Sequence, residues 1–154
     1  MKTPDEEVQR KVREWIAYAD DDLRFAHIGL TLPGEQRPPY HLVAYHAQQC
    51  AERYLKAYLV CLGIDFPRTH NISTLLELCS DHGEWPLTLR DAEELTDYAV
   101  ASRYPGEAAE VTAQDAQRAI ELADRVRSQV CAALRKLGME SIREETLPES
   151  PAEG

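Results

Sequence analysis

Residues 44–63, AYHAQQCAERYLKAYLVCLG, combine an imidazole, amides and charged groups with an apolar run that ends at Gly63. On a helix with about 100° between successive residues, Gln49 and Lys56 lie on one polar side, and His46 lies at its edge. A histidine can gain or lose a proton near neutral pH, and a lysine carries a positive charge. Every surface helix has a polar side, so the pattern suits a binding site or an ordinary solvated face.

The ordinary explanation has support in the same stretch. Glu52 and Lys56 are four residues apart, which is the spacing of a common ion pair on a helix surface. The other side of the helix is apolar and contains small residues that let another helix approach; it carries Val43, Ala47, Cys50, Ala51, Tyr54, Ala57, Tyr58, Cys61 and Leu62. The sequence therefore predicts a core helix with one polar stripe, whose role this chemistry leaves open.

Two further polar positions lie outside this helix. His70 precedes Asn71, a residue that favours a helix N-cap, so the histidine also suits a loop or capping role. The segment SRYPG, residues 102–106, interrupts the helical pattern. In a packed turn Tyr104 would be buried, and Arg103 would satisfy carbonyl groups at a helix end.

The elements that must position these residues are helical almost throughout. Apolar residues recur at spacings of three and four in segments 8–30, 40–62, 71–81, 86–99 and 112–138. No segment alternates with a period of two for long enough to predict a strand. The sequence predicts an all-α fold, an up-and-down bundle of about five helices with a long loop at 31–39 between the first and second.

Capping signals support these limits. Asn71, and Thr112 with Asp115, are suited to cap helix starts. Gly63 is suited to a left-handed helix end. Pro86 and Thr88, with Asp91 three residues after the threonine, are expected to open the fourth helix.

The composition is that of one helical domain. The chain has 154 residues, of which 44% are hydrophobic and 29% charged, and its net charge is −10. We expect the domain to span residues 5–138 and residues 139–154 to form a disordered acidic tail, because that segment is rich in proline and carboxylates. Cys50, Cys61, Cys79 and Cys131 lie in apolar helical patterns without a C-x-x-C pair, which predicts buried free thiols.

Several kinds of site and location are not indicated. No Glu-x-x-His pair predicts a metal site, and neither a glycine-rich phosphate loop nor a Ser-His-Asp signature occurs, so we expect no metal and no cofactor. No apolar run approaches the roughly 20 residues of a membrane-spanning helix. The N-terminus shows no apolar secretory segment. The expectation is a cytoplasmic protein without membrane contact.

Three segments in order resemble the HEPN domain family: HAQQCAERYLKA at 46–57, PRTH at 67–70 and SRYP at 102–105. The residues that match the family pattern are His46, Gln48, Gln49, Glu52, Lys56, His70, Arg103, Tyr104 and Pro105. Cys50 stands where the family usually has Ala, and Arg53 where it usually has Lys. The resemblance covers about residues 8–138. It implies an up-and-down helical bundle with an extra short helix, usually a homodimer.

Many HEPN proteins are ribonucleases or toxins, and their signature is an Arg, four to six intervening residues, and a His at the dimer interface. Here Arg37 precedes His41 with three intervening residues and His46 with eight, while Arg24 and Arg68 stand closer still to the next histidine. None of the five histidines fits. The net charge of −10 also disfavours RNA, which prefers a cationic cleft. We expect neither ribonuclease activity nor an RNA partner.

Another branch of the family resembles the helical substrate-binding half of nucleotidyltransferases. Such proteins often work with a separate minimal nucleotidyltransferase, which carries the catalytic carboxylates and the metal. The resemblance implies a nucleotide-binding module in a toxin–antitoxin-like pair, with no catalytic residue of its own. The implied nucleotide-binding residues are His46, Gln49, Lys56, His70, Arg103 and Tyr104. A guanidinium can bind phosphate with a planar fork of donors, and a tyrosine can stack on a base.

Two alternatives stay open. A divergent ribonuclease would use Arg37 with His41, or His46 with Arg103, as a phosphate-binding and acid–base pair. A non-enzymatic adaptor would use only its dimer interface.

Overall fold

Three long helices lie along a common axis, and two shorter helices cover them. The computed structural model describes residues 3–99 and 110–142. Their helices are α1 (Glu6–Leu30), α2 (Tyr40–Leu62), α3 (Ile72–Ser80), the 3₁₀-helix η1 (Leu87–Tyr98) and α4 (Ala113–Lys136). Strands are absent from these two ranges. The predicted all-α bundle, with a long connection between the first two helices, is confirmed.

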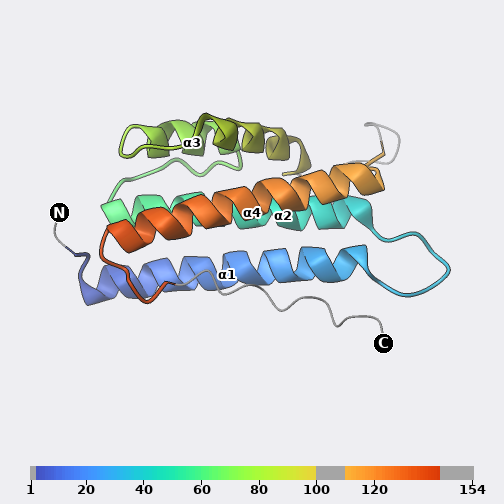
Figure 1. The fold of residues 1–154 in the computed structure, drawn as a ribbon, viewed down its shortest axis with the longest axis horizontal. Coiled ribbons are helices and arrows are strands. Elements are labelled where there is room, and N and C mark those ends of the chain that lie inside the picture. Colours follow the sequence, from blue (N-terminus) through green and yellow to red (C-terminus); the bar gives the residue numbers. More distant parts are fainter. Residues whose placement is uncertain (1–2, 100–109, 143–154) are drawn as a thin grey trace.

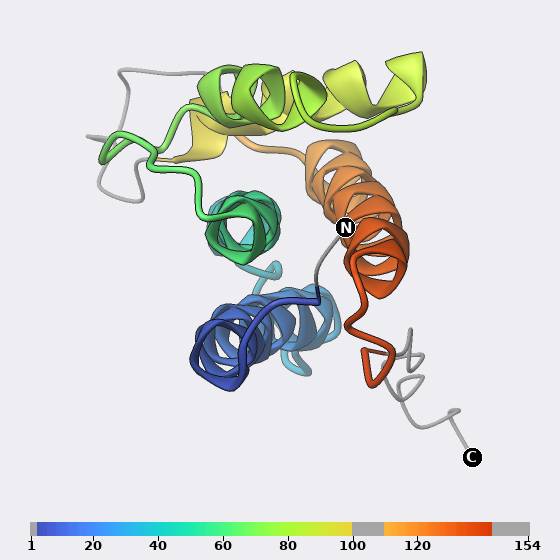
Figure 2. The ribbon, with the colours of Figure 1, turned by 90° about the vertical axis from the view of Figure 1, so that its left-hand side faces the viewer.

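Helix α2 lies at the centre of this arrangement. It runs opposite to α1, while α4 runs beside it in the same direction (Figure 1). Seen along the bundle, α3 and η1 form a layer over α2 and α4, on the side away from α1 (Figure 2). Because α2 contacts every other described helix, three of its polar residues, Gln48, Glu52 and Lys56, are buried. None of the described helices is long and apolar enough to cross a bilayer.

The helix ends follow local chemistry. The Asn71 side chain accepts a hydrogen bond from the Thr74 N–H at 3.2 Å, as expected of an N-cap. Thr112 and Asp115 form a reciprocal capping box at the start of α4. Gly63 ends α2 with a left-handed φ of 68°. These three predicted caps are confirmed.

The fourth predicted helix differs in type from the prediction. Residues Leu87–Tyr98 form a 3₁₀-helix preceded by Pro86, and no side chain caps its start. Leu89, Ala92 and Leu95 are its buried residues. Their spacing of three matches the three residues per turn of a 3₁₀-helix, which places all of them on one face. Thr88 lies inside the first turn, and Asp91 forms ion pairs with arginines of α4 instead.

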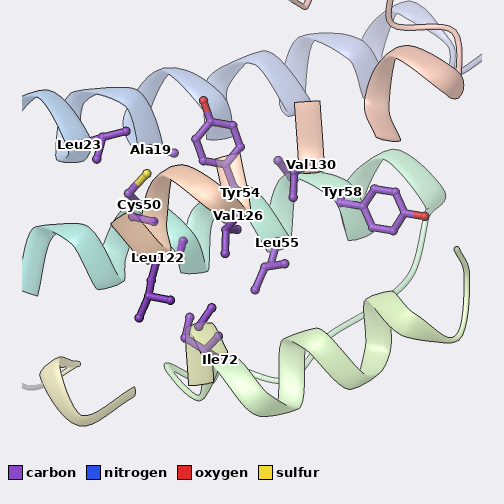
Figure 3. Close-up of a cluster of buried hydrophobic side chains, with 14 of the residues drawn as sticks. Ala19, Leu23, Cys50, Tyr54, Leu55, Tyr58, Ile72, Leu122, Val126 and Val130 are labelled. Carbon is purple, nitrogen blue, oxygen red and sulfur yellow. The ribbon is translucent and has the colours of Figure 1, made fainter. Parts of the chain in front are cut away.

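The core is made of aliphatic, tyrosine and sulfur-containing side chains from all of the described helices. Ala19 and Leu23 of α1 lie on the side of Cys50 and Tyr54, while Leu55 of α2 lies toward Ile72 (Figure 3). All four cysteines are buried and free, as predicted. Burial raises the pKa of the Cys79 thiol to about 12, so this sulfur stays protonated at neutral pH.

Packing continues beyond the predicted domain limit at residue 138. Met139 and Ile142 are 1% and 7% exposed, and both belong to the core. The Met139 Sδ lies 3.9 Å from the Cys61 Sγ at the end of α2. The predicted tail from 143 onward lies outside the described residues.

Close packing between α1 and α2 requires a glycine. A Cβ added at Gly29 would lie 2.7 Å from the Cγ2 of Val43, closer than real Cβ contacts come. Val43 is 2% exposed and its χ1 is restricted by β-branching, so it has little freedom to move away. The two helices approach closely only because residue 29 has no side chain.

We expect Gly29→Ala to lower the free energy of unfolding by about 1 kcal/mol, because overpacking outweighs the helix propensity gained by alanine. Urea unfolding of Gly29→Ala, Val43→Ala and the double variant measures this. Val43→Ala removes the methyl group that clashes, so adding Gly29→Ala to that background should cost nothing or stabilise. Equal costs of Gly29→Ala in both backgrounds would contradict this contact.

Candidate functional site

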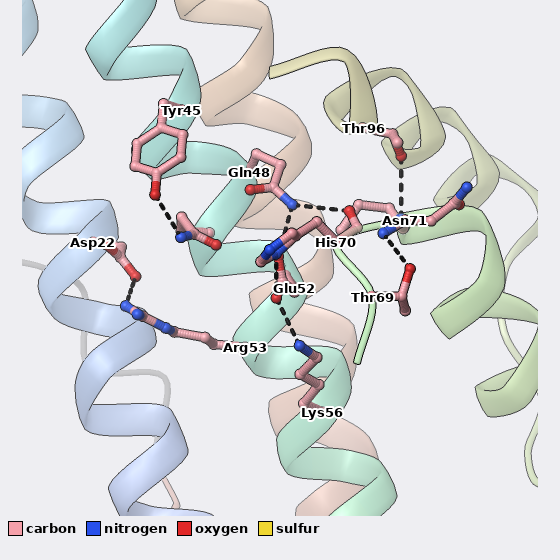
Figure 4. A network of polar contacts seen from close by, with 12 residues as sticks. Asp22, Tyr45, Gln48, Glu52, Arg53, Lys56, Thr69, His70, Asn71 and Thr96 are labelled. Carbon is pink, nitrogen blue, oxygen red and sulfur yellow. Dashed lines mark hydrogen bonds and ion pairs between the residues drawn. The ribbon is translucent and has the colours of Figure 1, made fainter. Parts of the chain in front are cut away.

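The polar stripe of α2 lies between α1 and the segment that follows α2. We name it the α2 polar face; it consists of Tyr45, His46, Gln48, Gln49, Glu52, Arg53 and Lys56 of α2 together with His70 (Figure 4). Four of the six residues predicted for nucleotide binding are in this set: His46, Gln49, Lys56 and His70. The other two, Arg103 and Tyr104, lie outside the described residues.

Glu52 is the centre of this face. Its carboxylate accepts hydrogen bonds from the Lys56 Nζ at 2.7 Å and the Gln48 Nε2 at 2.9 Å, and it lies 3.0 Å from the His70 Nδ1. Burial favours the protonated form of Glu52. The hydrogen bonds from Lys56, Gln48 and His70 outweigh that effect and hold the pKa of this carboxyl below its ordinary value.

The i,i+4 ion pair between Glu52 and Lys56 that the sequence predicted is present, but it lies inside the protein and not on its surface. Their side chains are only 5% and 11% exposed. The Lys56 ammonium also lies 5.9 Å from the ring centroid of Trp15 and 5.7 Å from that of Phe66. Phe66 belongs to the segment that turns back over α2 after Gly63. The pair is buried because residues distant in sequence cover it.

Gln48 also belongs to this face, although it is not among the six residues predicted for nucleotide binding. It is fully buried, and its Nε2 also donates to the backbone carbonyl of His70 at 3.2 Å. Its Oε1 is buried and finds no hydrogen-bond partner among residues 3–99 and 110–142. Gln48 thus fixes the segment ahead of α3 against α2. Its signal in the sequence was the spacing of four residues to Glu52, together with its match to the family pattern.

A second carboxylate, Asp22 of α1, organises the other edge of the face. Asp22 is 7% exposed, and its carboxylate lies 2.9 Å from the His46 Nδ1 and also accepts a hydrogen bond from Arg53. The His46 ring lies 4.7 Å from the Phe25 ring. The Arg53 guanidinium lies 5.6 Å from the centre of the Tyr18 ring. Asp22 therefore sets the orientation of one imidazole and one guanidinium at the surface.

The four predicted residues that the structure describes differ in how accessible they are to a ligand. The His70 side chain is 65% exposed, whereas that of His46 is 26% exposed. Gln49 is partly exposed, and its Nε2 donates to the Tyr45 hydroxyl at 2.9 Å. Lys56 points inward to Glu52. A solute would therefore meet the two histidines, Gln49 and Arg53 before it could reach Lys56.

A third carboxylate cluster lies beneath this face and joins three helices. Tyr54 of α2 donates its hydroxyl hydrogen to Asp20 of α1. The Arg127 Nε of α4 lies 3.1 Å from the Asp20 carboxylate and 3.2 Å from the Tyr54 hydroxyl oxygen. Burial and the neighbouring Asp20 raise the pKa of Tyr54. Tyr54 is fully buried and the Arg127 side chain is 11% exposed, whereas the Asp20 side chain is 33% exposed. The cluster therefore joins helices and reaches the surface mainly through the Asp20 carboxylate.

No group of three or more His, Cys, Asp or Glu side chains with the spacing to hold a metal ion occurs in residues 3–99 and 110–142.

We expect Glu52→Gln to destabilise the fold by about 3 kcal/mol at pH 7, because it leaves the Lys56 ammonium buried without a counter-charge. The folded-state pKa of Glu52 is depressed, so its contribution is complete above its ordinary value of 4.5 and is lost as the pH falls through the lowered value. Denaturant unfolding at pH 7 and at decreasing acidic pH should therefore show the parent and variant converging.

Two variants serve as controls. Glu14→Gln breaks an i,i+4 pair with Arg10 whose side chains are 58% and 59% exposed, and it should change the stability by less than about 0.5 kcal/mol. Lys56→Met combined with Glu52→Gln removes both buried charges and should recover part of the loss. If Glu52→Gln and Glu14→Gln cost the same, the Glu52–Lys56 pair is not buried as described.

Comparison with known proteins identifies the family of this chain. The profile of the HEPN domain family matches residues 12–136. No protein of curated function matches the chain. Among solved structures, the chain is similar to TT1696 from Thermus thermophilus, with 28% identity and a TM-score of 0.68 over 78% of this chain and 95% of that one.

A second solved structure, ST0689, is described as an archaeal HEPN homologue. It is 29% identical with a TM-score of 0.64, over 80% of this chain and 97% of that one. The family profile spans α2 and its polar face completely, as well as most of α1 and all of α4. The chain belongs to the HEPN domain family.

Proposed function

We propose that this HEPN protein is a nucleotide-binding module without catalytic residues of its own, and that it works with a separate minimal nucleotidyltransferase in a toxin–antitoxin-like pair. The observation that carries the proposal is the row of ligand-accessible donors on the α2 polar face. His46, Arg53 and His70 lie along one side of α2, and the exposed Tyr18 ring lies beside Arg53.

This set of groups suits a nucleotide. A guanidinium offers donors and positive charge to phosphate oxygens, and two imidazoles offer ring nitrogens that can form hydrogen bonds with them. Tyr18 is 62% exposed and offers a flat ring on which a base can stack. The Gln49 amide can form hydrogen bonds with the polar edge of a base. Arg103 and Tyr104 would add a second guanidinium and a second ring, as the family pattern implies.

Lys56 has a different role in this proposal from the one first expected of it. Its ammonium is held at 2.7 Å by Glu52 and is nearly covered, so binding a phosphate would require it to leave a buried carboxylate. We assign Lys56 to holding Glu52 ionised. Glu52 in turn positions the His70 imidazole at the surface.

The division of labour follows from what each partner would contribute. Nucleotidyl transfer needs carboxylates that hold a metal ion, and the partner enzyme would supply both. The helical protein would supply the binding surface or be the partner's target. This assignment rests on the family resemblance and on the lack of the Arg–His ribonuclease spacing in the sequence.

We expect ATP, GTP, CTP, UTP or AMP to raise the melting temperature by roughly 5–10 °C at about 100 times its Kd, because a ligand that binds only the folded state stabilises it. A thermal-shift screen with and without Mg²⁺ measures this. His70→Ala and Arg53→Ala should remove the shift. Arg24→Ala, which changes an exposed guanidinium of α1 paired with Asp21, should keep it.

Other outcomes separate the alternatives. The absence of a shift with every nucleotide, in a protein that folds normally, would reject nucleotide binding. Cleavage of single-stranded RNA that disappears in His46→Ala would favour a divergent ribonuclease, since Asp22 orients the imidazole as a carboxylate does in acid–base sites. If no nucleotide raises the melting temperature and RNA is not cleaved, the remaining alternative is the non-enzymatic adaptor.

We infer that the protein forms a homodimer through the C-terminal part of α1. Phe25, Ile28 and Leu32 are 56%, 53% and 48% exposed within eight residues, and a monomer in solution would leave these apolar side chains in water. Burying them in a two-fold interface removes that cost. The same interface would place His46, which packs on Phe25, near the partner copy.

Sedimentation velocity tests this interface. We expect a dimer for the parent chain and a monomer for Phe25→Asp/Ile28→Asp, because charges at the centre of an interface oppose association. The matched control is Leu87→Asp, which changes an exposed leucine on a different helix and should leave the dimer intact. A parent chain that sediments as a monomer at micromolar concentration would contradict this inference.

A further inference from the structure

A groove lies on the outer layer of the bundle, between α3 and the segment that leads into η1. We name it the α3–η1 groove; its volume is about 500 Å³, within the range of ligand and peptide pockets. Its apolar lining comes from Leu76, Trp85 and Leu89, and carboxylates of Glu77, Glu84 and Glu93 stand along it. None of these residues belongs to the α2 polar face.

The apolar wall of the groove is already held in place. The Trp85 Nε1 donates to the Cys79 carbonyl at 2.9 Å, so the polar atom of the indole is satisfied within the protein. The Trp85 ring meets Tyr58 edge to face at 4.9 Å, and the Tyr58 hydroxyl donates to the His82 carbonyl at 3.2 Å. A preformed wall lowers the entropic cost of binding.

Gly83 belongs to the same wall. A Cβ at this position would lie 3.0 Å from the Tyr58 hydroxyl and 3.5 Å from the Trp85 Nε1. The approach to the Tyr58 hydroxyl is closer than most residues with a Cβ could make, whereas the distance to the Trp85 Nε1 is an ordinary van der Waals contact. These contacts leave the indole as a fixed surface beside the groove.

The charges of the groove favour a cation. Three carboxylates and one guanidinium, that of Arg90, line the groove, so its lining has a net negative charge. The Glu93 carboxylate accepts a hydrogen bond from the Ser73 hydroxyl at 3.2 Å. An ammonium or guanidinium could meet Glu77 or Glu84 and also lie over the Trp85 ring, which attracts cations. Electrostatic complementarity therefore selects a basic group.

The groove also has an apolar anchor point. Leu87 is 84% exposed, although large apolar side chains are usually covered. It lines the groove beside Pro86. An occupant that matches the groove therefore carries an apolar side chain next to its basic one.

We propose that the α3–η1 groove is a docking site for a segment of another protein that places a Lys or Arg side chain next to an apolar side chain. The inferred α1 interface already accounts for association with a second copy of this chain, and the acidic groove requires a basic partner, whereas this chain carries a net charge of −10. The groove is separate from the nucleotide site and from the α1 interface, so its test succeeds or fails independently of both.

Selection from a random 12-residue peptide display library, with the full chain as target, tests the docking site. We expect the enriched peptides to share a Lys or Arg within two positions of a Leu, Ile, Met or Phe. Their synthetic forms should bind about tenfold more weakly to Glu84→Lys and to Leu87→Asp, since both changes remove a contact that the proposal requires. Raising the salt concentration should also weaken peptide binding to the parent chain, because salt screens the attraction between the basic side chain and the carboxylates.

A matched variant distinguishes the groove from general attraction to an acidic protein. Glu35→Lys makes the same chemical change as Glu84→Lys at an exposed position in the connection between α1 and α2, and peptide affinity should be unchanged in this variant. Circular dichroism confirms that each variant is folded. The proposal is overturned if no peptide is enriched, if the enriched peptides lack the basic–apolar pairing, or if the control and groove variants weaken binding equally.

Discussion

The carboxylate of Glu52 imposes the constraint on which much of this structure depends. It sits on the helix that all of the others contact, where an ionised group without partners would be very costly. Lys56 and Gln48 of the same helix donate hydrogen bonds to this carboxylate, and His70 of the segment that follows contacts it through its Nδ1. That segment must therefore return across α2 before α3 begins. The placement of the outer layer is thus linked to one buried charge.

The same physical rule repeats on α1. Asp22 is nearly buried and is satisfied by His46 and Arg53 of α2, while Asp20 is bonded to Tyr54 of α2 and Arg127 of α4. Each carboxylate joins helices that the apolar core alone would only hold in contact. These bonds give the helices a defined register, because shifting one helix along another would leave a buried charge without its partner.

In this arrangement, the basic side chains differ in role according to their exposure. Charges that are covered, such as Lys56, are held by carboxylates and serve the fold. Groups that reach the surface, such as His70 and Arg53, are positioned by those same carboxylates and remain open to a solute. A polar stripe can therefore be structural on its inner edge and functional on its outer edge. The acidic α3–η1 groove lies in a different layer and suits a ligand of opposite charge.

The sequence by itself determined where the helices lie, the caps at Gly63, Asn71 and Thr112, and the burial of the cysteines, because periodicity and capping depend on residues only a few positions apart. It also carried the family pattern. Only the tertiary structure decided that Glu52 and Lys56 are buried and that Gln48 and Asp22 belong to the site. Those facts depend on partners 18 to 31 residues away, such as His70 on Glu52 and Arg53 on Asp22. A helical pattern defines a polar side, but which part of that side stays in water is set by the segments that fold over it.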